Sequence, residues 1–216
     1  WSWGIVLIVF FLASTGVSHI GRQAKHSTPG DIVQKTGARD AWQVTANGAP
    51  FAVAALASIV WPWHAWHVVG AGAIAASSAD TWATEMGMLS RQAPHSVIDW
   101  KRVPAGTSGG VTPLGIGAAI AGSALVAGVT FLAAWGSVAA CGALTGGLAG
   151  SIADSILGAT IQTKRRCPLC GTSTERVVHS CGTTTEITGG IRWLDNDGVN
   201  LLSSVIGAAA GTACLT

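Results

Sequence analysis

The chain alternates long apolar segments with polar stretches, and this alternation limits its fold more than any other feature. Six apolar segments can be delimited, at residues 3–20, 47–61, 66–88, 113–135, 138–161 and 198–215. Most of them approach the roughly 20 residues that a helix needs to cross a bilayer. Only 10% of the 216 residues are charged, whereas soluble domains carry about 25%. The sequence therefore predicts a single all-α membrane domain, a polytopic integral membrane helical bundle with about six transmembrane segments.

The basic residues indicate how this bundle is oriented in the membrane. All twelve Lys and Arg lie within three stretches, at residues 22–39, 91–102 and 164–192. Cytoplasmic loops carry an excess of Lys and Arg, so we predict that these three loops are cytoplasmic and that both chain ends lie outside. The expected location is the inner membrane of a prokaryote. No basic region precedes residues 3–20, so we interpret them as a span and not as a signal peptide. Because the chain opens on Trp1 without an initiator Met, we expect it to be processed or truncated.

Three acids lie inside or at the edge of the apolar segments. A charge at the bilayer centre costs about 2.5–3.5 kcal/mol on insertion scales, so Asp80, Glu85 and Asp154 are expected to face a cavity or a partner. On a helix, Asp80 and Thr81 share one face with Ser77, and Glu85 lies at its margin. Carboxylate and hydroxyl oxygens are the ligands that Mg²⁺ prefers. We predict a catalytic Mg²⁺ site here; acids hydrated at the boundary and a proton relay are the alternatives.

A basic pair and a glycine-rich turn follow the first two acids. Lys101 and Arg102 can bind phosphate, as a point charge and as a bidentate fork. The turn that follows can present backbone N–H groups to an anion; its candidate phosphate-binding residues are Thr107, Ser108, Gly109 and Gly110. The order of residues is not that of a Walker A loop. Membrane topology combined with an ordinary turn is the alternative explanation.

Two further polar clusters open apolar segments on the same predicted face of the membrane. One holds Gln43 and Asn47. The other holds Asp195, Asn196, Asp197 and Asn200. Asn and Asp are favoured helix N-caps, but the second cluster is larger than one cap requires. We therefore assign the amides to substrate or nucleotide binding, and Asp195 and Asp197 to additional Mg²⁺ ligation.

The loop at residues 162–197 contains a cysteine and histidine cluster with the spacing C-x2-C-x8-H-x-C. Its members are Cys167, Cys170, His179 and Cys181. Four such ligands suit a closed tetrahedral Zn²⁺ site, which is structural rather than catalytic. We predict a small zinc-knuckle-like loop in the cytoplasm, where a disulfide is less expected. Cys141 and Cys214, in apolar segments, are interpreted as small packing residues.

Small residues recur every fourth position in one apolar segment. They are Gly142, Gly146 and Gly150. Such spacing allows helix backbones to approach closely in lipid. We expect most of the glycines to serve helix packing.

The order of these motifs resembles that of a known membrane family. The residues that carry the resemblance are Gly37-Ala38-Arg39 with Gln43 to Gly48, Ala79 to Glu85, Lys101 to Pro104 with Gly109 to Val111, Asp154 to Ala159, and Asn196 to Asn200. The chain is similar to the integral membrane family that contains transmembrane protein 19 and the plant and cyanobacterial phytyl-phosphate kinases. The resemblance covers most of the family core. The cysteine loop is expected in some members only.

The resemblance implies a kinase that transfers a phosphate from a nucleoside triphosphate, CTP or another, to an isoprenoid monophosphate of the phytyl type. The product is the diphosphate. Phosphoryl transfer depends mainly on positioning and charge neutralisation, which the acids, basic pair and glycine-rich turn could supply. The expected partners are the nucleotide, the lipid phosphate and the bilayer, and not nucleic acid. The alternatives are a CTP-dependent lipid kinase or nucleotidyltransferase acting on another lipid, and a non-enzymatic transporter or scaffold.

Overall fold

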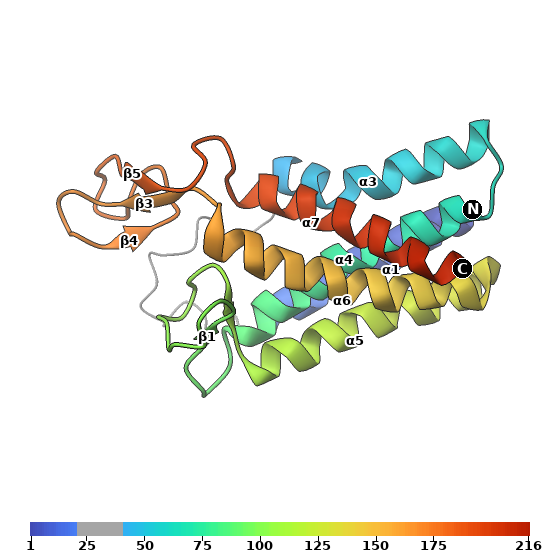
Figure 1. Cartoon of the computed structure of the whole chain (residues 1–216), viewed down its shortest axis with the longest axis horizontal. Helices are drawn as coiled ribbons and strands as arrows, with labels where there is room; N and C mark the ends of the chain where they lie inside the picture. Colours follow the sequence, from blue (N-terminus) through green and yellow to red (C-terminus); the bar gives the residue numbers. More distant parts are fainter. Residues whose placement is uncertain (21–40) are drawn as a thin grey trace.

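The computed structural model describes residues 1–20 and 41–216, and these form a bundle of long helices with polar loops at one end (Figure 1). The helices are α1 (Ser2–His19), α3 (Ala41–Val60), α4 (Ala65–Gly87), α5 (Pro113–Thr130), a π-helical turn (Phe131–Trp135), α6 (Gly136–Thr160), α7 (Asn196–Gly211) and a final 3₁₀ turn (Thr212–Leu215). The predicted basic stretch at 22–39 and the motif at 37–39 lie outside the described residues.

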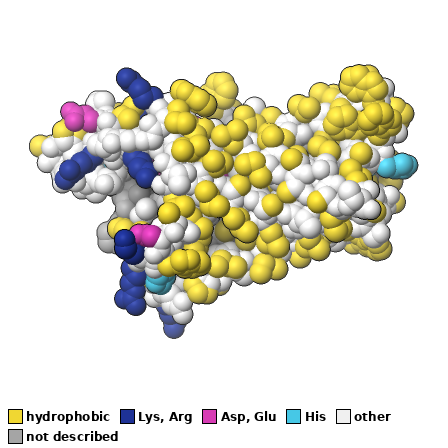
Figure 2. Space-filling view, in the orientation of Figure 1, with side chains coloured by type: hydrophobic (Ala, Val, Ile, Leu, Met, Phe, Trp, Pro, Cys, Tyr) yellow, Lys and Arg dark blue, Asp and Glu magenta, His cyan; other side chains and the backbone are white. Residues whose placement is uncertain are grey.

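Four helical stretches are long and apolar enough to cross a membrane, at residues 2–19, 41–60, 113–160 and 196–215. The third contains both α5 and α6, because the chain reverses at Ala134, where φ is 64°, and Gly136, where φ is 85°. Apolar side chains cover the outer surface of the helices (Figure 2), for example Leu132 and Ile59, which are 85% and 78% exposed. This surface suits contact with lipid.

Helix α4 lies at the centre of the bundle and packs against every other long helix that the structure describes. It is absent from the four apolar stretches, although its residues 70–79 are all buried. Its Ser77, Ser78, Asp80 and Thr81 lower its hydropathy, and protein rather than lipid surrounds most of it. The predicted segment at 66–88 is therefore the core helix of the bundle.

Two boundaries differ from those predicted. Helix α3 begins at Ala41, six residues before the predicted start of its segment at 47. Hydropathy missed this polar first turn, where Thr45 Oγ1 donates to Ala41 O at 2.7 Å. The gap predicted between the segments at 113–135 and 138–161 contains Gly136, and the observed reversal includes this residue but begins two positions earlier, at Ala134.

Glycines bring α4, α6 and α7 into backbone contact. A Cβ on Gly146 of α6 would lie 2.4 Å from Gly207 O of α7 and 2.6 Å from Gly72 Cα of α4. One turn later, a Cβ on Gly150 would lie 2.3 Å from Ala76 Cβ. The predicted role of this glycine series in helix packing is confirmed.

We expect Gly146→Ala to destabilise the bundle by about 1–3 kcal/mol, because the added methyl group meets backbone that cannot move aside. The apparent Tm in detergent should fall by several degrees. Gly128→Ala in α5 is the matched control, since a Cβ there has nothing within 4 Å. An equal Tm for the two variants would contradict the close-packing account.

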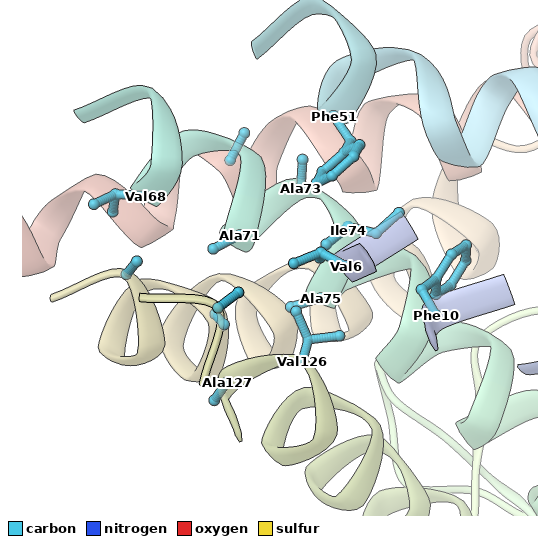
Figure 3. Packing of buried hydrophobic residues seen from close by; sticks show 14 residues of the cluster. Val6, Phe10, Phe51, Val68, Ala71, Ala73, Ile74, Ala75, Val126 and Ala127 are labelled. Carbon is cyan, nitrogen blue, oxygen red and sulfur yellow. The ribbon is translucent and has the colours of Figure 1, made fainter. Parts of the chain in front are cut away.

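Apolar side chains from α1, α3, α4, α5, α6 and α7 meet in one buried cluster inside the bundle. Figure 3 shows Phe51 of α3, Val6 and Phe10 of α1, Ile74 of α4 and Val126 of α5 around one interior. At the end of this core, aromatic rings from three elements stack together. The ring centroids of Trp3 and Trp135 are 4.5 Å apart, and those of Trp3 and Phe51 are 5.2 Å apart.

The polar loops contain strands that the all-α prediction did not include. Strands β1 (His95–Ser96) and β2 (Gly110–Val111) form an antiparallel pair, and β3 (Lys164–Arg166), β4 (Ser173–Thr174) and β5 (Glu186–Gly189) form a sheet in the order β4-β3-β5. The strands are two to four residues long and mostly polar, so no apolar alternation marked them. The all-α prediction is correct only for the bundle.

The two ends of the molecule differ in character. Lys and Arg gather over the loops at one end (Figure 2), and both chain termini lie at the other (Figure 1). The prediction that both ends of the chain lie on the side opposite the basic loops agrees with this arrangement.

The prediction that Cys141 and Cys214 are separate packing residues was wrong. They form a disulfide at the end of the bundle that carries the termini, joining the start of α6 to the final 3₁₀ turn. The two residues are 73 positions apart, and only the antiparallel arrangement of α6 and α7 makes them neighbours.

We expect reduction of this disulfide, or Cys214→Ser, to cost about 2–4 kcal/mol of stability, because the bond restricts the unfolded chain. Thermal unfolding in detergent with and without reductant measures the effect. The double variant Cys141→Ser/Cys214→Ser is the control, and its Tm should not respond to reductant. A wild-type Tm that is also unresponsive would refute the role of the disulfide.

Candidate functional site

The acids predicted on separate helices converge at the loop end of the bundle. The Asp154 carboxyl on α6 lies within hydrogen-bonding reach of Asp80 on α4 and of Ser203 on α7, and Glu175 of the long loop is near enough to interact with it. Its Oδ2 atom is buried and has no hydrogen-bond partner among the described residues. Burying a charged oxygen without a partner is costly, so this atom fits a ligand to a cation.

Hydrogen bonds between helices hold the floor of this acid cluster. The Ser77 Oγ donates to Asn47 O on α3 at 2.8 Å and lies 2.8 Å from Ser204 Oγ on α7. Within α7, the Ser203 Oγ donates to Asn200 O at 3.0 Å. Asn47 and Asn200 are both buried, and these two bonds use their backbone carbonyl oxygens. Ser77 lies one turn before Asp80 on α4, and Ser203 also reaches Asp154, so the serines that donate these bonds lie beside the acid cluster.

The glycine-rich turn lies on the end of α6, next to the acid cluster. A Cβ on Gly109, whose φ is +79°, would lie 2.4 Å from Ala159 Cβ and 2.7 Å from Ser155 O. Gly158 lies one turn beyond Asp154, and a Cβ added there would lie 3.2 Å from Ser108 Cβ. Glycine at 109 satisfies both the left-handed backbone and the close approach to α6. The predicted phosphate turn and the predicted metal site are thus neighbours in space.

A hydrogen bond ties this turn to the long loop. The Ser108 Oγ donates to Glu175 Oε1, and Glu175 is the acid that also interacts with Asp154. Within the turn, Gly110 N donates to Thr107 O at 3.0 Å. The loop, the turn and the acid cluster therefore form one continuous polar region.

The basic pair predicted to bind phosphate does not lie among the acids. The Lys101 side chain is 81% exposed and forms a salt bridge with Asp99 at 2.9 Å. The hydrogen bond with Asp99 raises the pKa of Lys101, and the same bond lowers the pKa of Asp99. Arg102 is exposed and pairs by its backbone with His95. In this arrangement the pair faces solvent at the loop end.

The other predicted residues lie around the edge of the region. Asp195 is exposed and caps α7, accepting a hydrogen bond from Gly198 N at 3.1 Å. The following side chains are half-buried: Gln43, Thr81, Glu85, Thr107, Asn196 and Asp197. Asp195 therefore has a capping function that uses one of its oxygens.

The four predicted zinc ligands come together in the long loop. The donor atoms of Cys167, Cys170, His179 and Cys181 lie within 4.8 Å of one another. The Cys167 and Cys181 Sγ atoms are 3.6 Å apart, and His179 Nδ1 is 3.1 Å from Cys181 Sγ. Tetrahedral zinc with bonds of 2.0–2.3 Å requires ligand separations of about 3.3–3.8 Å, so the cluster is close to the size that zinc needs.

Without a metal, local structure and electrostatics favour the thiolate at Cys181 and the thiol at Cys170. Cys170 N donates to Cys167 Sγ at 3.5 Å, and Gly171, with φ of +66°, closes the turn between β3 and β4. Hydrogen bonds with Thr183 and His179 lower the pKa of Cys181 to about 6. A thiolate is the form of cysteine that binds metals. Hydrogen bonding to Cys181 and burial raise the pKa of Cys170 to about 11.

Sequence reasoning missed the residues that link these features. Glu175 and Ser203 both reach Asp154, but neither lies in a pattern that distinguishes it from an ordinary loop acid or helix serine. A pocket of about 160 Å³ also lies between the long loop and the start of α7; its lining includes Gln162, Thr163, Arg165, Glu175, Arg192 and Trp193. Asp195 and Asn196, predicted as metal and nucleotide ligands, also line it, and the basic residues at 164–166 were a further signal.

Comparisons with known proteins agree with a membrane bundle. The family model for "Integral membrane protein DUF92" matches residues 1–208. Protein PGR of Arabidopsis thaliana is 32% identical over 232 residues, which cover 94% of this chain and 78% of the plant protein. An uncharacterized membrane protein of Methanocaldococcus jannaschii is 29% identical over 211 residues, covering 96% and 74% of the two chains. No solved structure matches the chain.

Proposed function

Because the chain belongs to the integral membrane protein family DUF92, we propose that it is a membrane kinase acting on a lipid phosphate. It transfers a phosphate from a nucleoside triphosphate, CTP or another, to an isoprenoid monophosphate of the phytyl type and releases the diphosphate. The observation that supports this most directly is the buried, unpartnered Oδ2 of Asp154 beside Asp80 and Glu175. A carboxylate cluster next to a glycine-rich turn suits a metal-bound phosphate.

The donor set fits Mg²⁺, which takes carboxylate and phosphate oxygens. Asp80 and Asp154 would hold it, with Glu85, Asp197 and the newly found Glu175 as nearby candidates. When bound, the ion would neutralise negative charge on the phosphates. The chain's own residues position the reactants. In the turn at 107–110, Thr107 N and Gly110 N donate to backbone oxygens of the loop, so the backbone N–H groups of Ser108 and Gly109 are the ones proposed to face a phosphate, and Asn47 and Asn200 keep the floor polar. A phosphate nucleophile needs no general base.

The lipid substrate would approach from the membrane. Exposed apolar side chains surround the helices (Figure 2), so an isoprenoid tail could lie against them with its phosphate at the loop end. The basic loops support a cytoplasmic location for that end, because cytoplasmic loops carry an excess of Lys and Arg. The cysteines support the same orientation, because the disulfide lies at the opposite end and free thiols lie among the loops, as oxidising and reducing compartments would favour.

The cysteine and histidine cluster would hold a structural Zn²⁺. Four protein ligands leave no open coordination position, so we assign it to folding of the long loop and not to catalysis. Glu175 lies on that loop between Cys170 and His179. By folding the loop, the metal would hold Glu175 in position beside the acid cluster without contacting the cluster itself.

The direct test incubates purified protein in detergent with Mg²⁺, a panel of prenyl phosphates that includes phytyl phosphate, and each of CTP, ATP, GTP and UTP. Mass spectrometry should detect the prenyl diphosphate. A product that is heavier by a nucleoside monophosphate would instead indicate nucleotidyl transfer. Absence of any product across the panel would count against an enzyme and favour a transporter or scaffold.

A further inference from the structure

We propose that the pocket between the end of α6, strand β3 and the start of α7 binds the phosphates of the nucleoside triphosphate, with Trp193 against the base. This inference rests on the proposed function and assigns its nucleotide site. The pocket holds about 160 Å³, less than the roughly 300–1,000 Å³ of sites for drug-sized ligands. It would therefore enclose part of a nucleotide, and the remainder would lie at its rim.

The chain builds this pocket from two segments that are fixed to each other. Residues 190–194 lie along residues 161–163, since Thr163 N donates to Leu194 O at 2.8 Å and Ile191 N donates to Ile161 O at 2.9 Å. The Thr163 Oγ1 also donates to Ile191 O at 2.5 Å. A Cβ on Gly190, whose φ is +76°, would lie 2.0 Å from Gln162 O. Arg192 and Trp193 therefore lie on a segment whose backbone is held in place by these hydrogen bonds.

The lining has the chemistry of a polyphosphate site. Arg165 and Arg192 line the pocket from two segments of the chain, and guanidinium groups pair with phosphate through two parallel hydrogen bonds. Asn196 at the start of α7 also lines it, and the N-terminus of a helix favours anions. These features bring two positive charges to the lining of one small volume.

Two carboxylates in the lining favour a metal-bound form of the ligand. Glu175 and Asp195 would repel free phosphate, but a polyphosphate carrying Mg²⁺ presents a cation to them. Glu175 also bonds to Ser108 of the glycine-rich turn and interacts with Asp154. The end of the phosphate chain can therefore point from the pocket toward the acid cluster.

The surroundings favour a nucleotide over a lipid headgroup. The pocket lies among the polar strands beyond the helices, and Val177 and Trp193 are its apolar lining residues. Seven of its nine lining residues are polar or charged, which suits phosphates better than an isoprenoid tail. Trp193 is 76% exposed at the rim, where its ring can stack on a base, because every base offers a π-face.

Equilibrium binding of Mg–CTP and Mg–ATP to the full chain in detergent, without prenyl phosphate, tests the assignment. Isothermal calorimetry should show binding at least tenfold weaker for Arg192→Gln and for Trp193→Ala, with Trp193→Phe near wild type. Arg91→Gln and Trp100→Ala are matched controls, since both side chains are exposed on the other loop, and they should bind normally. Binding of Mg-bound inorganic triphosphate should be weakened by Arg192→Gln and unchanged by Trp193→Ala.

The outcomes separate this inference from the proposed function. Loss of nucleotide binding in the pocket variants supports the site even if no prenyl diphosphate is ever formed. If the wild type forms prenyl diphosphate but the pocket variants bind nucleotide normally, the assignment of the nucleotide to this pocket is wrong. The proposed kinase activity would then still hold. Failure of the wild type to bind either nucleotide, or displacement of triphosphate by phytyl phosphate, also overturns the assignment.

Discussion

Asp154→Asn is expected to reduce phosphoryl transfer by about 10³-fold or more while the bundle stays folded. Removal of one electrostatic contact to the reacting charge costs about 2.7–4 kcal/mol in other enzymes, and a lost metal ligand should cost at least as much. Asn has nearly the same shape as Asp and carries no charge beside Asp80 and Glu175. The variant should therefore unfold at the wild-type Tm or above it.

The combination of the two results identifies the role of this residue. Initial rates with saturating nucleotide and prenyl phosphate give the activity, and thermal unfolding in detergent gives the stability. Glu186→Gln serves as the control, because Glu186 is exposed on β5 and its replacement should leave the rate within about twofold. A wild-type rate for Asp154→Asn would exclude a catalytic metal at this position. A large fall in Tm would indicate a structural role instead.

Cys167→Ser is expected to abolish zinc binding and to unfold the long loop. Structural zinc contributes about 10–16 kcal/mol of apparent binding energy in small zinc domains, which three short strands cannot replace. The wild type should contain one zinc per chain by elemental analysis, and the variant less than a tenth of that. Protease sensitivity within residues 162–195 should rise sharply, and prolonged chelation of the wild type should reproduce the effect.

Cysteines at the other end of the molecule provide the matched control. Cys214→Ser removes a disulfide-bonded cysteine without touching the cluster, so its zinc content and loop protection should equal those of the wild type. The same proteolysis should leave the helical bundle of Cys167→Ser intact, because the helices pack through α4 and not through the loop. Wild-type protein without zinc would refute the metal assignment.

Local chemistry made the bundle predictable. The apolar composition of each segment predicts that it is buried in the membrane domain. The cost of a charge in such a segment identified Asp80 and Asp154 as candidate site residues before any contact was known. The sequence also predicted that Asn47 and Asn200 would lie near these acids, because the basic loops oriented all the segments. The backbone oxygens of these two residues accept hydrogen bonds from Ser77 and Ser203, and the role of their amides stays a prediction.

Features that depend on tertiary contacts were not predictable in this way. The disulfide needs α6 and α7 to run antiparallel, and nothing in the residues around Cys141 or Cys214 records that. The strands of the long loop are too short to show a period, and Glu175 becomes part of the site only because the folded loop returns over α6. Nothing in the sequence fixed the direction of the Lys101 side chain either. Its observed partner is the nearby Asp99.

The disulfide gives the last helix a second attachment to the rest of the chain. A cut anywhere in the long loop would separate α7 from α6 in sequence, yet the bond between Cys141 and Cys214 would keep both pieces in one molecule. Such a nicked protein would migrate as one band until reduced and would retain Asn200 and Ser203 beside the acids. The disulfide therefore holds α7 to α6 independently of the continuity of the long loop.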